Sequence, residues 1–83
     1  MVGPKDLVSK VDPSGLVSLT IGSDAGLSKG NTLEAMRYSP TARYLGTLRI
    51  VEVTPHQAIA QPVGRLNAPL RVGDRVASRI LGS

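Results

Sequence analysis

Apolar and polar residues alternate along much of the chain, and this two-residue period is typical of strands that bury one face. The clearest run covers residues 16–21, where Val17, Leu19 and Ile21 fall on one face and small polar residues fall on the other. Weaker runs also predict strands, and they cover residues 5–11, 31–38, 58–63 and 74–81. The pattern therefore predicts an all-β chain of short strands.

A further strand is predicted over residues 43–53, where the apolar positions change phase. Leu48 and Ile50 lie on one parity, whereas the two valines that follow lie on the other. A phase change of this kind is typical of a bulge or a bend. Gly46 marks a place for it, and we expect this strand to serve two sides of a barrel.

Turn-forming residues separate these runs. Residues 12–15 and 54–57 predict two hairpins, because each contains a Pro that presets the first central position of a turn. Ser23 or Asp24 is expected to cap one short helical turn over residues 25–29, since the glycines there leave too little for a longer helix.

One stretch occurs twice, at residues 26–33 and 69–76. Each copy has a turn-forming residue, a Leu, two variable positions, a Gly, an Asn or Asp, one variable position, and an aliphatic residue that starts a strand. Other positions of the two halves also correspond: Val8 with Ile50, Pro13 with Pro55, and Val17 with Ile59. This internal repeat predicts a small six-stranded barrel built from two similar three-stranded halves with pseudo-twofold symmetry.

The repeated turns are interpreted as structural. We expect Gly30 and Gly73 to occupy equivalent places in the two halves, with Asn31 and Asp74 beside them. Asp favours turns because its side chain bonds nearby backbone groups, so Asp74 is expected to bond within its own turn.

The Gly-Asp turn after Leu70-Arg71-Val72 resembles the GD box of cradle-loop barrels, the group that includes RIFT and double-psi barrels. The chain is also similar, over residues 15–27, 29–34, 44–46, 53–55, 58–60 and 72–76, to the C-terminal domain family of flagellar assembly protein T and to barrel domains that end many planctomycete proteins of unknown role. This resemblance implies a non-enzymatic barrel involved in assembly or attachment. The strand order is left open between a RIFT-type, a double-psi and a Src-homology-3-like barrel.

Composition limits the chain to one small domain. Its 83 residues hold no Cys, no Trp, no Phe and two Tyr, so neither disulfides nor a zinc site can brace the core. We expect a single domain over residues 1–83, with residues 1–4 and 82–83 outside the folded part. No stretch reaches the roughly 20 apolar residues of a membrane span. Compartment, oligomeric state and the question of a longer parent protein stay open.

The sequence predicts no catalytic, cofactor-binding or metal-binding residue, and we expect no enzyme activity. His56, the single His, lies at a hairpin tip with no partner that the sequence can place beside it. Asp24 and Asp74 lie in Gly-flanked turns, where structural roles are favoured. The Gly-rich residues 22–30 lack the Gly-Lys-Ser/Thr ending of a phosphate-binding loop.

The formal net charge of +4 comes from scattered Lys and Arg. Arg75 and Arg79 share a strand parity, and with Arg49 they form a candidate basic interaction face. We therefore predict a structural, protein-interaction or assembly module with a protein partner or self-association. The alternative is a nucleic-acid-binding small barrel using this Arg-rich face, although the usual stacking aromatics are missing.

Overall fold

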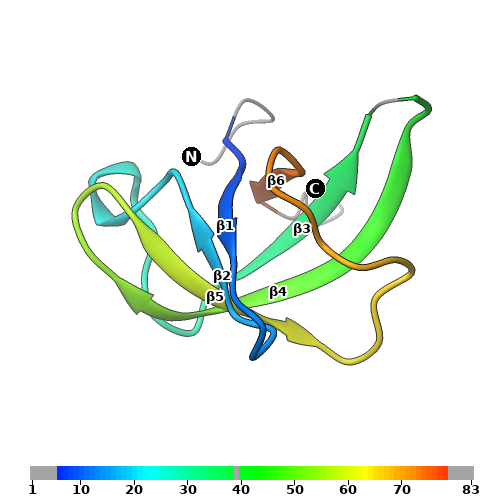
Figure 1. Cartoon of the computed structure of the whole chain (residues 1–83). Coiled ribbons are helices and arrows are strands. Elements are labelled where there is room, and N and C mark those ends of the chain that lie inside the picture. The colour runs from blue at the N-terminus through cyan, green and yellow to red at the C-terminus, as the bar shows by residue number, and fades with distance from the viewer. Residues whose placement is uncertain (1–5, 39, 79–83) are drawn as a thin grey trace, which may run out of the picture.

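The computed structural model describes residues 6–38 and 40–78. The predicted ends at 1–4 and 82–83, and Arg79 of the candidate basic face, lie outside these residues. The described chain holds one short 3₁₀ turn, η1 (Ser23–Ala25), and six strands (Figure 1): β1 (Val8–Val11), β2 (Val17–Leu19), β3 (Thr32–Arg37), β4 (Arg43–Val53), β5 (Ala58–Val63) and β6 (Arg75–Ser78). The all-β prediction is confirmed. No helix in the described ranges is long and apolar enough to cross a membrane.

The six strands form one antiparallel sheet in the order β1-β2-β5-β4-β3-β6. The sheet curls strongly, which brings its first and last strands together (Figure 1). They meet at a bridge between Leu7 and Arg75. Val8 N donates to Asp74 O at 2.8 Å and Val76 N donates to Asp6 O at 2.9 Å across the same seam. The predicted small six-stranded barrel is therefore confirmed as the architecture.

The inner face of the curled sheet is aliphatic. The predicted inward residues Val17, Leu19 and Ile21 are buried. The other buried apolar residues come from the remaining five strands and from two loops: Val8, Leu27, Leu33, Ala35, Leu45, Leu48, Ile50, Ala58, Ala60, Leu70 and Val76. Because no aromatic ring is among them, the core is filled by short branched side chains.

Strand β4 is long because it pairs with β3 through its first part and with β5 through its second. The register shifts once on each side, so that Leu45 and Val51 are extra residues relative to their partner strands. The predicted phase change is therefore real, and it occurs at Val51. Gly46 lies beside the other bulge, where its φ of 149° suits a residue without a side chain.

Two details of the sequence prediction were wrong. The helical turn covers Ser23–Ala25 instead of residues 25–29, because Gly26 at φ 89° ends it. No side chain caps it, because the N-cap residue is Gly22, and the neighbouring hairpin accepts the hydrogen bonds of the first amides instead: Ser23 N donates to Thr54 O at 2.8 Å and Asp24 N to Pro55 O at 3.0 Å.

The second error concerns the alignment of the halves after their first hairpins. Val17 and Ala58 face the core, whereas Leu16 and Ile59 face outward, so Val17 does not correspond to Ile59. The reason is that the second hairpin is one residue shorter than the first. Its closing hydrogen bond joins Thr54 and Gln57, whereas that of the first joins Asp12 and Leu16.

In the loop that carries η1, Gly22 packs closely against the backbone of the β4–β5 hairpin. A methyl group added there would lie 2.6 Å from Gln57 N and closer still to Thr54 O. We expect Gly22→Ala to cost about 3 kcal/mol, as overpacking against rigid backbone does. Gly64→Ala is the control, because its Cβ would meet open space and only its φ of 74° opposes it, at about 1–2 kcal/mol. Urea unfolding measures both, and an equal loss in the two variants would contradict the close contact.

Candidate functional site

The turn before β6 is held by its own Asp. Gly73 takes φ 96°, which lets the chain reverse, and Asp74 N donates to Arg71 O at 3.1 Å. Asp74 Oδ2 accepts a hydrogen bond from Arg71 N at 2.7 Å. Within the ranges that the structure describes, Asp74 is the one buried polar or charged residue, at 4% exposure. A buried carboxylate needs partners, and the backbone supplies only the first.

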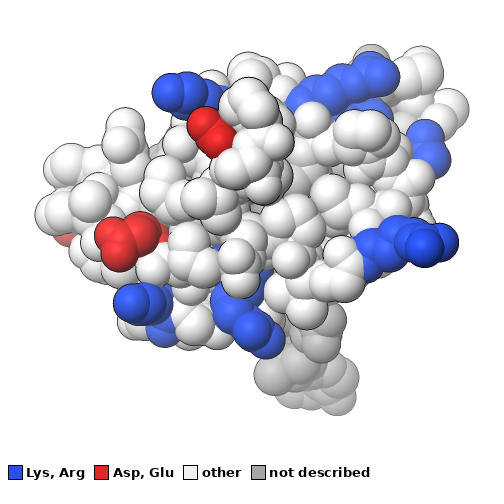
Figure 2. Space-filling view, turned by 60° about the horizontal axis from the view of Figure 1, so that its bottom comes forward, with Lys and Arg blue, Asp and Glu red and all other residues white. Residues whose placement is uncertain are grey.

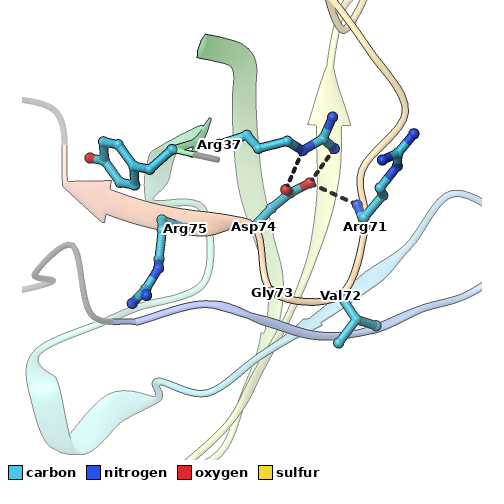
Figure 3. Close-up of a pocket in the computed structure, with 7 residues that line it drawn as sticks. Arg37, Arg71, Val72, Gly73, Asp74 and Arg75 are labelled. Carbon is cyan, nitrogen blue, oxygen red and sulfur yellow. Dashed lines mark hydrogen bonds and ion pairs between the residues drawn. The ribbon is translucent and has the colours of Figure 1, made fainter. Parts of the chain in front are cut away.

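Arg37 supplies the others (Figure 3). Its Nε donates to Asp74 Oδ1 at 2.7 Å, and its Nη2 donates to Asp74 Oδ2 at 2.8 Å and to Pro69 O at 2.9 Å. The register that pairs Met36 with Arg75 sets Arg37 opposite Asp74 in the next row of the sheet. The bidentate geometry fixes the end of β3 against the turn.

Sequence reasoning missed this pair. A signal was present, since Arg37 continues the parity of Leu33 and Ala35, which both face the core. A charged residue at a core-facing position requires a partner of opposite charge. The partner itself could not be identified, because it lies 37 positions away along the chain.

The surroundings of the pair favour the charged forms of both Asp74 and Arg37. Burial opposes ionisation of Asp74, but the hydrogen bonds from Arg37 and Arg71 N and the nearby positive charges outweigh it, so the pKa of Asp74 is lowered. The hydrogen bond with Asp74 raises the pKa of Arg37. The charge of Asp74 is thus compensated inside the fold, and the other arginines around the turn determine the sign of the surface.

A pocket of about 320 Å³ opens beside the turn, and it is lined by Arg37, Tyr38, Arg71, Val72, Gly73, Asp74 and Arg75. Val72 at the tip is 65% exposed and Tyr38 is 48% exposed. In Figure 3 the Arg71 guanidinium points away from the carboxylate, and Arg75 extends from the far side of the turn. We call Tyr38, Arg71, Val72 and Arg75 the turn surface. It offers positive charge, one exposed aliphatic side chain and one phenol.

The candidate basic face is divided by the sheet register. Arg49 lies opposite Thr32 and Arg75 lies opposite Met36, on the same outer face of β3 but two rows apart. Glu34 occupies the row between them. Arg75 therefore belongs to the turn surface, and Arg49 lies beyond an acidic residue.

Glu34 is part of a polar cluster on this outer face. Its Oε1 accepts a hydrogen bond from Tyr44 Oη at 2.7 Å, and its Oε2 accepts one from Thr47 Oγ1 at 3.1 Å. Tyr44 is 46% exposed, but its hydroxyl is held by this carboxylate. The cluster therefore places a negative charge within the candidate basic face.

The Gly30-Asn31 turn repeats the backbone arrangement without the ion pair. Gly30 takes φ 93°, Asn31 N donates to Ser28 O at 3.0 Å, and Asn31 Oδ1 accepts from Ser28 N at 2.9 Å. Asn31 is exposed, in contrast to Asp74. The two turns therefore differ in charge and in depth, and only the second adjoins the pocket.

His56 has a partner that the sequence did not indicate. Its Nδ1 lies 3.0 Å from Asp24 Oδ2, and this contact joins the β4–β5 hairpin to η1. Both side chains are largely exposed, at 84% and 62%. Among residues 6–38 and 40–78, no group of three His, Cys, Asp or Glu side chains could hold a metal ion.

Comparison of the chain with protein-family models, with curated proteins and with solved structures finds no match. The resemblance to cradle-loop barrels and to the flagellar assembly family therefore stays a prediction.

Asp74→Asn tests the ion pair. We expect the free energy of unfolding at neutral pH to fall by about 1.5–3 kcal/mol, the value of a hydrogen bond to a charged group. Folding lowers the pKa of Asp74, so its charged form stabilises the folded state fully at pH values above the pKa of the unfolded chain, which is near 3.9. This stabilisation is lost as the pH falls through the pKa of the folded chain. The difference between wild type and Asp74→Asn should therefore shrink in acid.

Urea unfolding at neutral and acidic pH measures this difference, with Asp24→Asn as the matched control. Asp24 is 62% exposed, so its replacement should cost no more than about 1 kcal/mol. A loss in Asp74→Asn that is the same at both pH values would contradict a charged pair.

Proposed function

We propose that the chain is a non-enzymatic interaction module that docks onto an acidic segment of a partner protein through the turn surface. The observation that carries this proposal is the combination of Arg71 with the exposed Val72 on a turn whose own carboxylate is already compensated. A partner carboxylate would meet positive charge, and an apolar neighbour in the partner would meet Val72.

The rigidity of the turn supports this function. Arg37 joins the turn to β3, and Val8 joins it to β1, so the loop that carries Arg71 and Val72 is held from two sides. Preorganised loops on a rigid scaffold lose little entropy on binding. Arg and Tyr are also enriched at protein interfaces, relative to the rest of a protein surface.

Nucleic-acid binding is the second candidate, because the net charge is +4 and three arginines line the pocket. Single-stranded nucleic acids are usually held by stacking aromatics as well as by charge. Tyr38 is the one aromatic residue at the pocket, and the other, Tyr44, is bonded to Glu34. The acidic segment of a protein is therefore the better-supported partner.

A fluorescein-labelled peptide of alternating Glu and Leu residues is the probe for docking. We expect Arg71→Ala to weaken its binding about fivefold or more, as loss of an interface arginine does. Arg65→Ala removes the same charge from an exposed loop position outside the pocket, and its affinity should stay within about twofold of wild type. Fluorescence anisotropy gives the dissociation constants.

The same assay separates the two candidates. Labelled single-stranded DNA and RNA replace the peptide, at low and at high salt. If the oligonucleotides bind and the peptide does not, the partner is a nucleic acid and the peptide-docking proposal is wrong. Equal peptide affinities for wild type and Arg71→Ala would contradict docking at the turn surface.

We also infer that the chain contains an internal repeat in which both turns are GD boxes. Gly30 N donates to Ile50 O and Gly73 N donates to Val8 O, both at 2.8 Å, and these are the positions that the repeat aligns. The bulges support the same alignment, because Ser9 in β1 and Val51 in β4 are the extra residues. When the β1–β6 seam is counted, so that the order β1-β2-β5-β4-β3-β6 forms a ring, exchanging the halves leaves the neighbours of every strand unchanged.

Asn31→Asp tests the equivalence of the turns. An Asp at this position can accept the Ser28 N hydrogen bond as Asp74 accepts that of Arg71 N. We expect the free energy of unfolding of Asn31→Asp, measured by thermal unfolding, to lie within about 0.5 kcal/mol of that of the wild type. Asn31→Ala should cost about 1 kcal/mol, because it removes that acceptor. A larger loss in Asn31→Asp than in Asn31→Ala would contradict equivalent turns.

A further inference from the structure

The outer face of β1, β2, β5 and β4 carries two rows of side chains that run across the strands. In the first row, the register joins Lys10 to Ser18, Ser18 to Ile59, and Ile59 to Glu52. A positive charge therefore stands at the β1 end of the row and a negative charge at the β4 end. Ser18 and Ile59 form its uncharged middle.

The second row has the opposite arrangement. Asp12 N bonds Leu16 O at 2.8 Å, and Gln61 is the partner of Arg49. The β2–β5 register, which pairs Val17 with Ala60, sets Leu16 opposite Gln61 when it is continued by one position. The row thus reads Asp12, Leu16, Gln61, Arg49, with the negative charge on the β1 side.

The four charges at the ends of these rows are exposed, and the contacts of Asp12 are local: its Oδ2 accepts a hydrogen bond from Ser14 N at 2.8 Å, and the nearby charge of Lys10 attracts it. Lys10, Asp12, Arg49 and Glu52 make no ion pair with any described residue. Three strand spacings of about 4.8 Å separate the ends of a row, which is too far for direct pairing across it. Each row is therefore an open dipole on the surface.

The middle of the face is hollowed. A depression of about 410 Å³ is lined by Lys10, Asp12, Leu16, Val17, Ser18, Glu52 and Ile59. Leu16 and Ile59 are partly exposed there, on the outer side of the sheet. Figure 2, in which the underside of Figure 1 comes forward, shows charged side chains of both signs bordering a broad uncharged area.

We propose that this face binds a second copy of the chain, as a symmetric dimer whose twofold axis runs parallel to the strands. Such an axis reverses the order of the strands in the partner. Lys10 then faces Glu52 of the second copy, and Asp12 faces Arg49 of the second copy, each pair occurring twice. Rotation about this axis satisfies all four charges, because each row carries opposite charges at its two ends.

The apolar middle and the charged ends contribute differently. Leu16 and Ile59 lose water when two sheet faces pack about 10 Å apart. The ion pairs at the margin favour arrangements in which opposite charges meet and disfavour those that bring like charges together. Leu16 and Ile59 are the two partly exposed aliphatic side chains that the outer positions of these rows offer, so little apolar area is buried, and the dimer should form at high protein concentration and weaken with salt.

Charge reversal tests the proposal without touching the core. Lys10→Glu and Glu52→Lys should each raise the dimer dissociation constant at least about tenfold, because each sets like charges face to face. An equimolar mixture of the two variants should associate again, since the glutamate introduced in one variant then faces the lysine introduced in the other. The double variant, which keeps the net charge of +4, should associate as wild type does.

Sedimentation velocity over a range of concentrations, at low and at high salt, measures association, and thermal unfolding checks that each variant is folded. A wild-type protein that stays monomeric at the highest concentration would overturn the dimer. If neither single variant weakens association, or if the mixture does not restore it, the dimer does not form through this face. Peptide docking at the turn surface is measured separately with dilute protein. The two proposals are therefore tested independently, and either can fail without the other.

Discussion

The closure of the sheet between β1 and β6 is the constraint on which the other features depend, because a curled sheet loses its free edges only when its ends meet. Asp74 stands at this seam. Its backbone oxygen accepts a hydrogen bond from Val8 N, and its carboxylate accepts hydrogen bonds from Arg37 and from Arg71 N. One residue thus connects the closing strand, the turn before it and the end of β3, which explains a buried ion pair beside an otherwise aliphatic core.

The strands could be predicted from the sequence to the extent that they depend on local pattern. The bounds of β4 and β5 match the predicted residues 43–53 and 58–63, since alternation and the Pro-containing turn are both local signals. The position of η1 could not be predicted, because its amides are satisfied by Thr54 and Pro55 of a distant hairpin. The same holds for the candidate site, where the turn itself was identified but its partner Arg37 was not.

The charges of this chain look scattered in the sequence, yet the sheet register sorts them into two kinds of surface. Around the Gly73-Asp74 turn the excess charge is positive, and the proposed acidic partner would meet it there. On the outer face of β1, β2, β5 and β4 each row carries opposite charges at its two ends, which suits the proposed self-complementary contact. Strand pairing, more than composition, therefore determines what each surface of so small a protein can bind.

The strand order also has a consequence for how the chain folds. β3 pairs with β4 and β6, and β6 pairs with β3, so each half of the chain contributes a strand that is paired only by the other half. Neither half has a closed core of its own. Most stabilising contacts therefore join residues far apart in sequence, and such a topology folds more slowly than a helical protein of equal length, in one cooperative step without a stable half-folded form.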